Sequence, residues 1–349
     1  MTSPLDAACP LPFAGYERVV LGHGSGGRLS RELLEQILLP ALGLSGRPPL
    51  EDQATLAPIV GRPALTTDSF VVRPLFFPGG DIGRLSVFGS VNDLAVGGAV
   101  PRDLALSFIL EEGLPLETLV KVARSVAQAC AEARVQLVTG DTKVVERGKA
   151  DGLYITTTAL GSVAPGIDVS VTRARPGDAV LVSGYLGDHG IAVMVEREGI
   201  AIDGELLSDA APLTGLVQSM LEVEPGIRCL RDPTRGGLAS ALNEIASASR
   251  VAIVIDDRQI PVRPAVRGVC ELLGLDPLYV ACEGRLVAVV PAAGAERVLQ
   301  VMRAHPLGRD ASIVGEIRHS PAGRVIERTS VGGERVVIML AGEQLPRIC

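Results

Sequence analysis

Two successive series of strand and helix patterns constrain the fold of this 349-residue chain more than any other feature. The stretch PGIDVSVTRARPGD, rich in proline and glycine, separates the two series and predicts a domain boundary near residue 165. On both sides of it, apolar runs of strand length alternate with apolar residues at helical spacing. The pattern predicts two α/β or α+β domains, over residues 1–165 and 166–340, and a short polar tail over 341–349.

The first series predicts four strands and three helices. The strands are PALTTDSFVV, DLALSFILEE, VQLVTGDTKVV and GLYITTTALGSV. The helices are SRELLEQILLPAL, with Ser30 as N-cap, RLSVFGSVNDLAVGGA and LETLVKVARSVAQACAEARV. The second series repeats the alternation and ends in the strand ERVVIML. From about Gly342 onward the chain is expected to be mobile, because it is polar and terminal.

Composition excludes several classes of protein. Aromatic residues make up 3% of the chain and tryptophan is absent, so aliphatic side chains must form the cores. The net charge of −7 argues against a nucleic-acid-binding surface. No apolar run has the length that a membrane span needs, and the N-terminal residues do not have the pattern of a signal peptide. The six cysteines form no C-x-x-C pair, which disfavours a zinc site or a disulfide framework and favours a reduced, cytoplasmic protein.

Three acidic residues stand out. Asp68 in TTDS and Asp141 in TGDTK are expected in turns beside strands, and Asp93 in VNDLA is expected inside an apolar helix. Aspartate is common in turns for purely structural reasons, which is the alternative for Asp68 and Asp141. An unpaired carboxylate inside an apolar helix costs folding free energy, so the position of Asp93 favours a functional role for this residue. If the three carboxylates converge, a cation such as Mg²⁺ must lie between them.

Three glycine-containing segments could bind phosphate oxygens through main-chain N–H groups. They are HGSGG, GDHG and RDPTRGGLA, and the last two lead into predicted helices. A packing turn is the alternative for each of them. The candidate residues in these segments are His23, Gly24, Ser25, Gly26, Gly27, Gly190, Arg235 and Gly236. The segment FFPGGDIG is another flexible glycine stretch, expected ahead of a helix.

The order of these motifs carries a resemblance. TTDS, VNDLA, TGDTKV, GDHG and DPTRGGLA resemble the PurM-like ATP-binding superfamily, which includes aminoimidazole ribonucleotide synthetase, selenophosphate synthetase and thiamine-phosphate kinase. With HGSGG, TTDSFVV-x-P-x-FFPGGDIG and the final PRIC, the nearest resemblance is to the HypE family of nickel–iron hydrogenase maturation proteins. The resemblance implies a two-domain α+β fold, homodimerisation through the N-terminal sheets, and an ATP site with magnesium between the subunits. Asn92 is assigned to that site together with Asp68 and Asp141.

The resemblance also gives the cysteine that ends this sequence a role. A terminal cysteine can be accidental, but in the HypE family it carries a carbamoyl group loaded by the carbamoyltransferase HypF. ATP-dependent dehydration then gives a thiocyanate, whose cyanide passes to iron on the HypC–HypD complex. The matching residue is Cys349, and the tail is expected to take an outward position for loading and an inward one for dehydration.

Further roles follow by position. Glu283 in ACEGRL matches the glutamate that serves the family as base, although a charged residue at a strand end is the alternative. Lys143 could contact phosphate or the carbamoyl oxygen. His23 and His189 could be catalytic or could make structural hydrogen bonds. The rival functions are a selenophosphate synthetase-like phosphotransferase, disfavoured because Cys9 has no lysine before it, and a non-catalytic scaffold.

Overall fold

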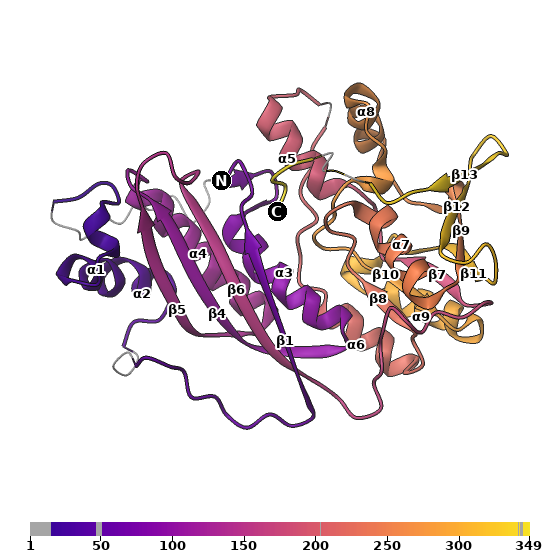
Figure 1. Cartoon of the computed structure of the whole chain (residues 1–349), viewed down its shortest axis with the longest axis horizontal. Coiled ribbons are helices and arrows are strands. Elements are labelled where there is room, and N and C mark those ends of the chain that lie inside the picture. The colour runs from indigo at the N-terminus through magenta and orange to yellow at the C-terminus, as the bar shows by residue number, and fades with distance from the viewer. Residues whose placement is uncertain (1–14, 47–50, 203, 341, 343–344) are drawn as a thin grey trace.

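The computed structural model describes residues 15–46, 51–202, 204–340, 342 and 345–349. Two β-sheets lie side by side, one in each half of the chain, and the two halves meet along the helix α3 (Ile82–Val96) (Figure 1). The mixed α and β class predicted from the sequence is confirmed. The last strand of the first sheet ends at residue 163 and the first strand of the second begins at residue 179, on either side of the expected boundary.

The N-terminal half contains a four-stranded sheet in the order β1-β6-β4-β5. Its strands are β1 (Arg62–Phe70), β4 (Ala99–Glu111), β5 (Gln136–Val145) and β6 (Leu153–Val163). The strands β4 and β5 are parallel, whereas β6 pairs antiparallel with both β1 and β4. Its other elements are η2 (Leu21–Gly24), α1 (Arg28–Glu32), η3 (Leu33–Leu38), α2 (Leu39–Ala41), β2 (Phe76–Phe77), β3 (Gly80–Asp81), α3 and α4 (Leu116–Ala133).

One face of this sheet is covered and the other is open. Residues of β6 alternate strictly between buried and half-buried, as expected for a sheet with one covered face. The helices α3 and α4 pack on the covered face. The open face carries Leu65, Val100 and Ile109, whose side chains are exposed, and Leu65 is 69% exposed. Exposed aliphatic side chains on an open sheet face are candidates for contact with a partner.

The C-terminal half contains a seven-stranded sheet in the order β13-β12-β9-β11-β7-β10-β8. Its strands are β7 (Ala179–Val182), β8 (Cys229–Arg231), β9 (Ala252–Asp256), β10 (Val287–Val290), β11 (Ser312–Arg318), β12 (Arg324–Arg328) and β13 (Glu334–Val337). Its helices are α5 (Asp188–Glu198), α6 (Thr214–Val223), α7 (Gly237–Ser249), α8 (Pro264–Leu273) and α9 (Ala292–Ala304), with short 3-10 turns η4 (Asp257–Gln259), η5 (Pro277–Tyr279) and η6 (Pro306–Gly308).

The helix α3 positions the residues between the two halves. Thirteen of its 15 residues are buried, so it packs on the N-terminal sheet and against the C-terminal half at once. Asp81 caps its N-terminus by accepting hydrogen bonds from the N–H groups of Gly83 and Arg84 at 2.7 and 3.1 Å. Among the helices that the structure describes, none is long and apolar enough to cross a membrane.

Several local predictions were wrong. The TTDS and TGDTK segments lie within β1 and β5, not in turns, because threonine and valine favour extended backbone. Ser30 is not an N-cap, since the helix begins at Arg28 after Gly27. The segment FFPGGDIG forms the β2–β3 hairpin. The predictions did not include α6 or β12.

Candidate active site

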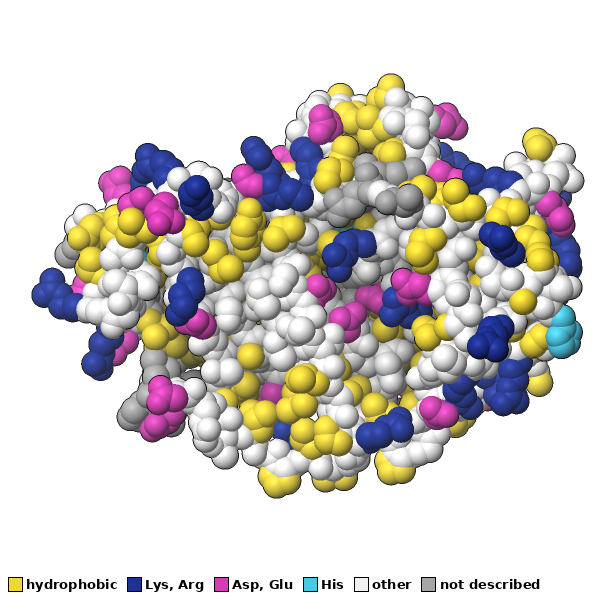
Figure 2. Space-filling model, in the orientation of Figure 1, with side chains coloured by type: hydrophobic (Ala, Val, Ile, Leu, Met, Phe, Trp, Pro, Cys, Tyr) yellow, Lys and Arg dark blue, Asp and Glu magenta, His cyan; other side chains and the backbone are white. Residues whose placement is uncertain are grey.

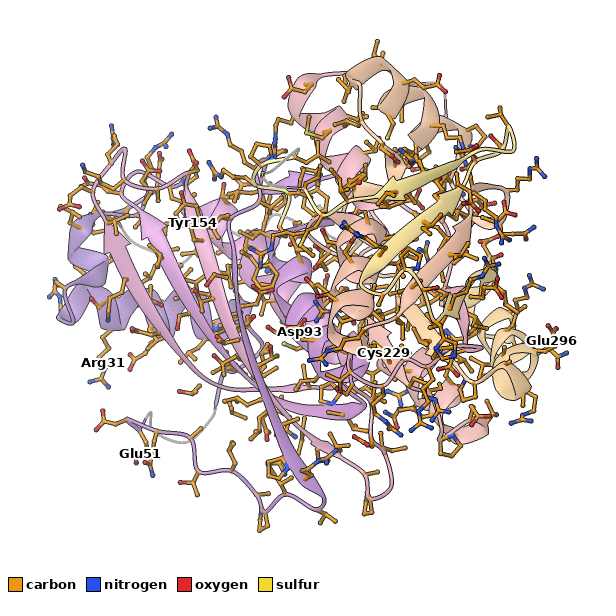
Figure 3. The ribbon with its side chains drawn as sticks, turned by 45° about the vertical axis from the view of Figure 1, so that its right-hand side comes forward. Arg31, Glu51, Asp93, Tyr154, Cys229 and Glu296 are labelled. Carbon is orange, nitrogen blue, oxygen red and sulfur yellow. The ribbon has the colours of Figure 1, made fainter. Side chains whose placement is uncertain are left out.

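Acidic side chains from both halves meet beside α3. The side chains of Thr66 and Asp68 point from β1 toward α3, because residues two apart on a strand share a face. The hydroxyl of Thr66 donates to the carboxylate of Asp93 at 2.8 Å. Figure 3 shows Asp93 at the boundary between the two halves, and Figure 2 shows acidic and basic side chains gathered in the hollow there.

The C-terminal half adds Asp232, which follows β8, and Glu283, which precedes β10. Both are buried. Burial, reinforced by Asp93, raises the pKa of Asp232 to about 7. Burial together with the neighbouring carboxylates, Asp232 first among them, raises the pKa of Glu283 well above its usual value. We call Asp68, Asp93, Asp232 and Glu283 the acidic cluster.

Arginine side chains offset part of this charge. Burial raises the pKa of Asp93, and the nearby carboxylate of Asp68 adds to that rise. The hydrogen bond from Thr66 and the positive charges of Arg231 and Arg235 oppose it. Arg235 is exposed and lies just before Gly236, the residue that precedes α7. The cluster therefore faces a cationic loop at the start of a helix, which is a suitable place for a phosphate group.

Asn92 fixes the loop that carries Glu283. Its amide nitrogen donates to the main-chain oxygens of Ala211 and Glu283, each at 3.0 Å, and its amide oxygen accepts from the N–H of Leu213 at 2.8 Å. The amide thus joins α3 to two loops of the C-terminal half. Both amide hydrogens and the amide oxygen of Asn92 are used in these contacts, and its predicted nucleotide contact stays a prediction.

Asp209 supports the same loop from the other side. Its carboxylate accepts from the N–H of Glu283 at 2.9 Å and pairs with the guanidinium of Arg285 at 3.4 Å. Arg285 also lies 3.9 Å from Asp188, which pairs with Arg263 at 3.0 Å. One oxygen of the Glu283 carboxylate has no hydrogen-bond partner within the described residues. The main chain of Glu283 is held firmly while its carboxylate remains available.

Within one chain the structure does not bring Asp141 and Lys143 to the acidic cluster. Asp141 lies opposite Ser107 on β4, in the row of side chains that crosses the open face of the sheet through Thr156 to Ser69 on β1. Neighbouring strands lie about 4.8 Å apart, so three strand spacings place Asp141 roughly 14 Å from Ser69. Asp68 precedes Ser69 on the same strand, so its side chain points to the opposite face of the sheet from Asp141. Lys143 pairs with Asp141 at 3.0 Å, and this contact lowers the pKa of Asp141.

The HGSGG segment lies with Asp141 and Lys143 and not with the acidic cluster. A side chain at Gly24 would stand 2.7 Å from the main-chain nitrogen of Val144 on β5, so only glycine fits there. His23 is buried, accepts from the N–H of Val20 at 3.2 Å, and packs edge-on against Tyr16. Gly26 donates to the hydroxyl of Ser30, and the hydroxyl of Ser25 donates to the main-chain oxygen of Gly22. Gly27 is the residue before α1.

The GDHG segment makes hydrogen bonds within the chain, and the predicted nucleotide contact of Gly190 stays a prediction. Gly190 donates its N–H to the main-chain oxygen of Ala281 at 3.0 Å, and a side chain there would stand 2.6 Å from Val280. His189 is fully buried, and burial lowers its pKa to about 4. Its Nε2 donates to the main-chain oxygen of Ile348 at 3.0 Å, so Nδ1 accepts from the hydroxyl of Ser208 at 2.8 Å. His189 therefore binds the tail.

The described end of the tail is docked between the two halves of the chain (Figure 1). The N–H of Val71 donates to the main-chain oxygen of Cys349 at 3.1 Å, and the N–H of Arg73 donates to that of Arg347 at 3.2 Å. Ile348 is 3% exposed and Cys349 is half-buried. Val71 follows Asp68 by three residues, or about 10 Å of strand. This is the inward of the two expected positions, and the outward one stays a prediction; residues 341, 343 and 344 lie outside the described residues.

A cation fits the acidic cluster chemically. Its donors are all carboxylate oxygens, which Mg²⁺ prefers, and burial, with the neighbouring carboxylates adding to it, raises the pKa of Asp93, Asp232 and Glu283. Within the described ranges, however, no three His, Cys, Asp or Glu side chains are arranged to hold a metal ion by themselves. An ion at this place would need further ligands, such as phosphate oxygens.

The sequence comparison agrees with this architecture. Residues 51–163 match the N-terminal domain and residues 175–328 the C-terminal domain of AIR synthase related proteins. The chain is 54% identical over 333 residues to carbamoyl dehydratase HypE of Cupriavidus necator, covering 95% of each chain.

Solved structures give the same result. A crystal structure of hydrogenase maturation protein HypE in complex with ATP is 45% identical, with a TM-score of 0.89 over 95% of this chain and 99% of that one. A HypE chain in a HypE–HypF complex is 47% identical, with a TM-score of 0.78 over 81% and 92%. This chain belongs to the AIR synthase related proteins and, among them, to the HypE family of carbamoyl dehydratases.

Proposed function

We propose that this protein uses ATP to dehydrate a carbamoyl group carried on Cys349 to a thiocyanate, which supplies cyanide for the iron of a nickel–iron hydrogenase. The observation that carries the proposal is the docking of the tail, because the main-chain oxygen of Cys349 binds the N–H of Val71, directly after β1, the strand that carries Asp68. The relatives are named carbamoyl dehydratases, and a similar hydrogenase maturation protein HypE has been solved in complex with ATP. A HypF-like carbamoyltransferase would load Cys349, and a HypC–HypD complex would receive the cyanide.

The reaction removes the elements of water from the group S–C(=O)–NH₂. The carbamoyl oxygen leaves in the released phosphate, ATP becomes ADP, and the two nitrogen protons go to a base and then to phosphate and solvent. Bound MgATP would supply the phosphoryl group that makes this oxygen a leaving group. Asp68, Asp93 and Asp232 would hold the cation, and Arg235 with the start of α7 would face the phosphates.

Glu283 is the proposed base. A carboxyl group of raised pKa binds a proton more readily than an ordinary one, and a nearby cation would keep it ionised and ready to accept. Asn92 and Asp209 orient it through its main chain, as described above. The carboxylate oxygen without a hydrogen-bond partner in the described part of the chain is free to receive a nitrogen proton.

A second copy of the chain would complete the nucleotide site. Asp141, Lys143 and the HGSGG segment belong to the β5 side of the sheet, away from the acidic cluster of the same chain. The open face between them carries exposed Leu65, Val100 and Ile109. Packing two such faces together would bury these side chains and bring the β5 side of one chain toward the acidic cluster of the other.

Intact-mass measurement tests the proposal. The protein is incubated with a HypF-like carbamoyltransferase and carbamoyl phosphate, and then with MgATP. The expected result is a gain of one carbamoyl group followed by the loss of one water, with no change in a Cys349→Ala variant. A carbamoyl group found on another residue would refute the assignment of Cys349. A soluble phosphorylated product without loss of water would favour a phosphotransferase instead.

A further inference from the structure

Four consecutive main-chain oxygens of the tail accept hydrogen bonds from the body of the protein. Those of Arg347 and Cys349 bind the N–H groups of Arg73 and Val71. That of Ile348 binds His189, and that of Pro346 binds Arg197. Hydrogen-bond donors that bind main-chain oxygens can hold a peptide whatever its side chains are. The tail is therefore held in its docked position by hydrogen bonds to its main chain and not by the burial of Ile348 alone.

Arg197, in the last turn of α5, makes two of these contacts. Its guanidinium donates to the main-chain oxygens of Pro346 and Arg347, both at 2.7 Å. It also donates twice to the main-chain oxygen of Arg73, at 2.8 and 2.6 Å. One side chain of the C-terminal half thus joins the tail to the N-terminal half. All of these acceptors are neutral oxygens, so salt should screen the contacts little.

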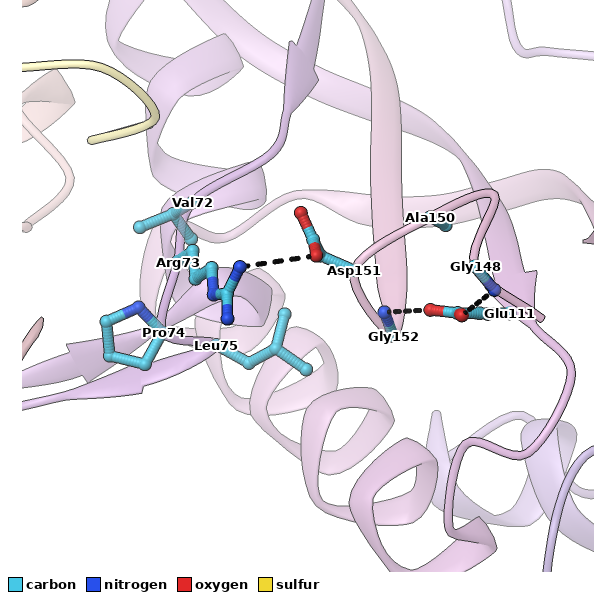
Figure 4. A pocket seen from close by; sticks show the side chains of 9 residues that line it. All are labelled: Val72, Arg73, Pro74, Leu75, Glu111, Gly148, Ala150, Asp151 and Gly152. Carbon is cyan, nitrogen blue, oxygen red and sulfur yellow. Dashed lines mark hydrogen bonds and ion pairs between the residues drawn. The ribbon is translucent and has the colours of Figure 1, made fainter.

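Asp151 makes the second contact, and it is shared. Its carboxylate pairs with the guanidinium of Arg347 and, at 3.5 Å, with that of Arg73. Figure 4 shows the Arg73–Asp151 pair on the wall of a cavity of about 540 Å³ that also borders Glu111. When the tail leaves, Arg73 can keep Asp151 paired, and Arg197 keeps its bonds to Arg73. Departure of the tail would leave no unpaired charge in the body, which lowers its cost.

Arg347 itself is held in an unusual conformation. Its φ of +56° lies in the left-handed region, which residues other than glycine adopt only when contacts enforce it. The bend turns the guanidinium back to the main-chain oxygen of Val71, at 3.1 and 3.2 Å. The tail would relax from this bend on release, so the docked state depends on its partners.

We propose that Arg197 and Asp151 form a tail clamp, with Arg197 as the positioning residue that sets where Cys349 stands for dehydration. The catalytic role of the clamp rests on the function proposed above, whereas the docking contacts themselves do not. Arg197 binds the main chain of the tail, and Asp151 adds a weaker contact specific to Arg347. Both residues can release the tail without leaving a buried, unpaired charge. The tail can therefore alternate between the docked position and an outward position for loading.

Alkylation of Cys349 by iodoacetamide tests the clamp in the isolated protein, without nucleotide or carbamoyl group. The rate is followed by mass spectrometry of the C-terminal peptide. Arg197→Ala should raise it about tenfold, because the hydrogen bonds of a charged donor are lost. Arg197→Lys should raise it nearly as much, since a lysine cannot span the three oxygens. Glu196→Ala, an exposed neighbour on the same helix, should leave it unchanged.

Internal controls separate the clamp from unfolding. Cys229 is fully buried, and its labelling would report global opening. Asp151→Asn should raise the alkylation rate of Cys349 less than Arg197→Ala does. At high salt the rates of Asp151→Asn and of the parent protein should become similar, because salt screens the ion pair. In single-turnover assays Arg197→Ala should load carbamoyl at the normal rate and dehydrate it about tenfold more slowly. An unchanged alkylation rate in folded Arg197→Ala and Arg197→Lys would overturn the clamp, whether or not thiocyanate forms.

Discussion

The side chain of Asn92 donates a hydrogen bond to the main-chain oxygen of Glu283 at 3.0 Å, across 191 residues of sequence. The contact joins the helix that carries Asp93 to the loop that carries the proposed base. Because Asn92 is buried and its amide bonds to two loops of the C-terminal half, this side chain contributes directly to the relative position of Asp93 and Glu283.

Asn92→Ala should therefore lower both stability and activity. It leaves the buried polar groups of Ala211, Leu213 and Glu283 without this partner, which should cost about 3 kcal/mol of unfolding free energy, measured by urea denaturation. Dehydration should fall about 100-fold, because small displacements of a catalytic group are costly. The matched control is Asn243→Ala, which also removes an amide that donates to two main-chain oxygens. Normal dehydration by a folded Asn92→Ala protein would remove Asn92 from this role.

Asp93 and Asp141 offer a test of the shared nucleotide site. Asp93→Ala and Asp141→Asn should each abolish ATP hydrolysis, since each removes a carboxylate from the proposed site. Mixing the two variants after partial unfolding and refolding should restore about a quarter of the parent activity, because half of the dimers then contain one intact site of two. An inactive mixture of variants that each dimerise normally would show that Asp93 of one subunit and Asp141 of the other do not form one shared site.

The open sheet face predicts the oligomeric state. Leu65→Arg should convert a dimer to a monomer in light scattering and abolish ATP hydrolysis, because it places charge in an aliphatic interface. The control is Leu272→Arg, at a position of similar exposure on α8 of the C-terminal half. A parent protein that is already monomeric and fully active would contradict the proposed dimer.

His189 predicts a dependence of stability on pH. Its folded pKa of about 4 lies below its usual 6.5, so the unfolded chain binds more protons between these values. Stability should be complete above pH 6.5 and fall by about 3 kcal/mol as the pH approaches 4. His189→Gln should remove this part of the pH dependence, whereas His319→Gln, at an exposed position, should not. Urea denaturation between pH 4.5 and 7.5 measures both, and an unchanged slope in His189→Gln would show that another group is responsible.

Residue patterns predicted the elements of the fold better than the geometry of the site. Strand-forming valine and threonine predicted β1 and β5, but the aspartates in them, Asp68 and Asp141, were taken for turn residues. Periodicity cannot tell which face of a sheet an aspartate occupies relative to its neighbours, so Asp141 was grouped with Asp68 although the two lie on opposite faces.

Two residues of the site were missed for different reasons. Asp232 lies inside the DPTRGGLA motif, and its place between a strand and a proline could have drawn attention to it. Asp209 belongs to no motif, and its role depends on contacts with Glu283 and Arg285 that only the folded chain creates. The tail was expected to be mobile from its polarity, which stays a prediction, but its docking through Ile348 and the donors of the body had no signal in the sequence.

The fate of the carbamoyl oxygen tests the central claim most directly. Protein carbamoylated on Cys349 with an ¹⁸O-labelled carbamoyl group is given MgATP for one turnover, and the released phosphate is analysed by mass spectrometry. Phosphoryl transfer to the carbamoyl oxygen predicts one ¹⁸O atom in each released phosphate. The mass of the protein should fall by the mass of one ¹⁸O-labelled water, although the oxygen itself leaves in the phosphate. Label that appears in water, or that stays on the protein while ATP is hydrolysed, would contradict ATP-dependent dehydration at Cys349.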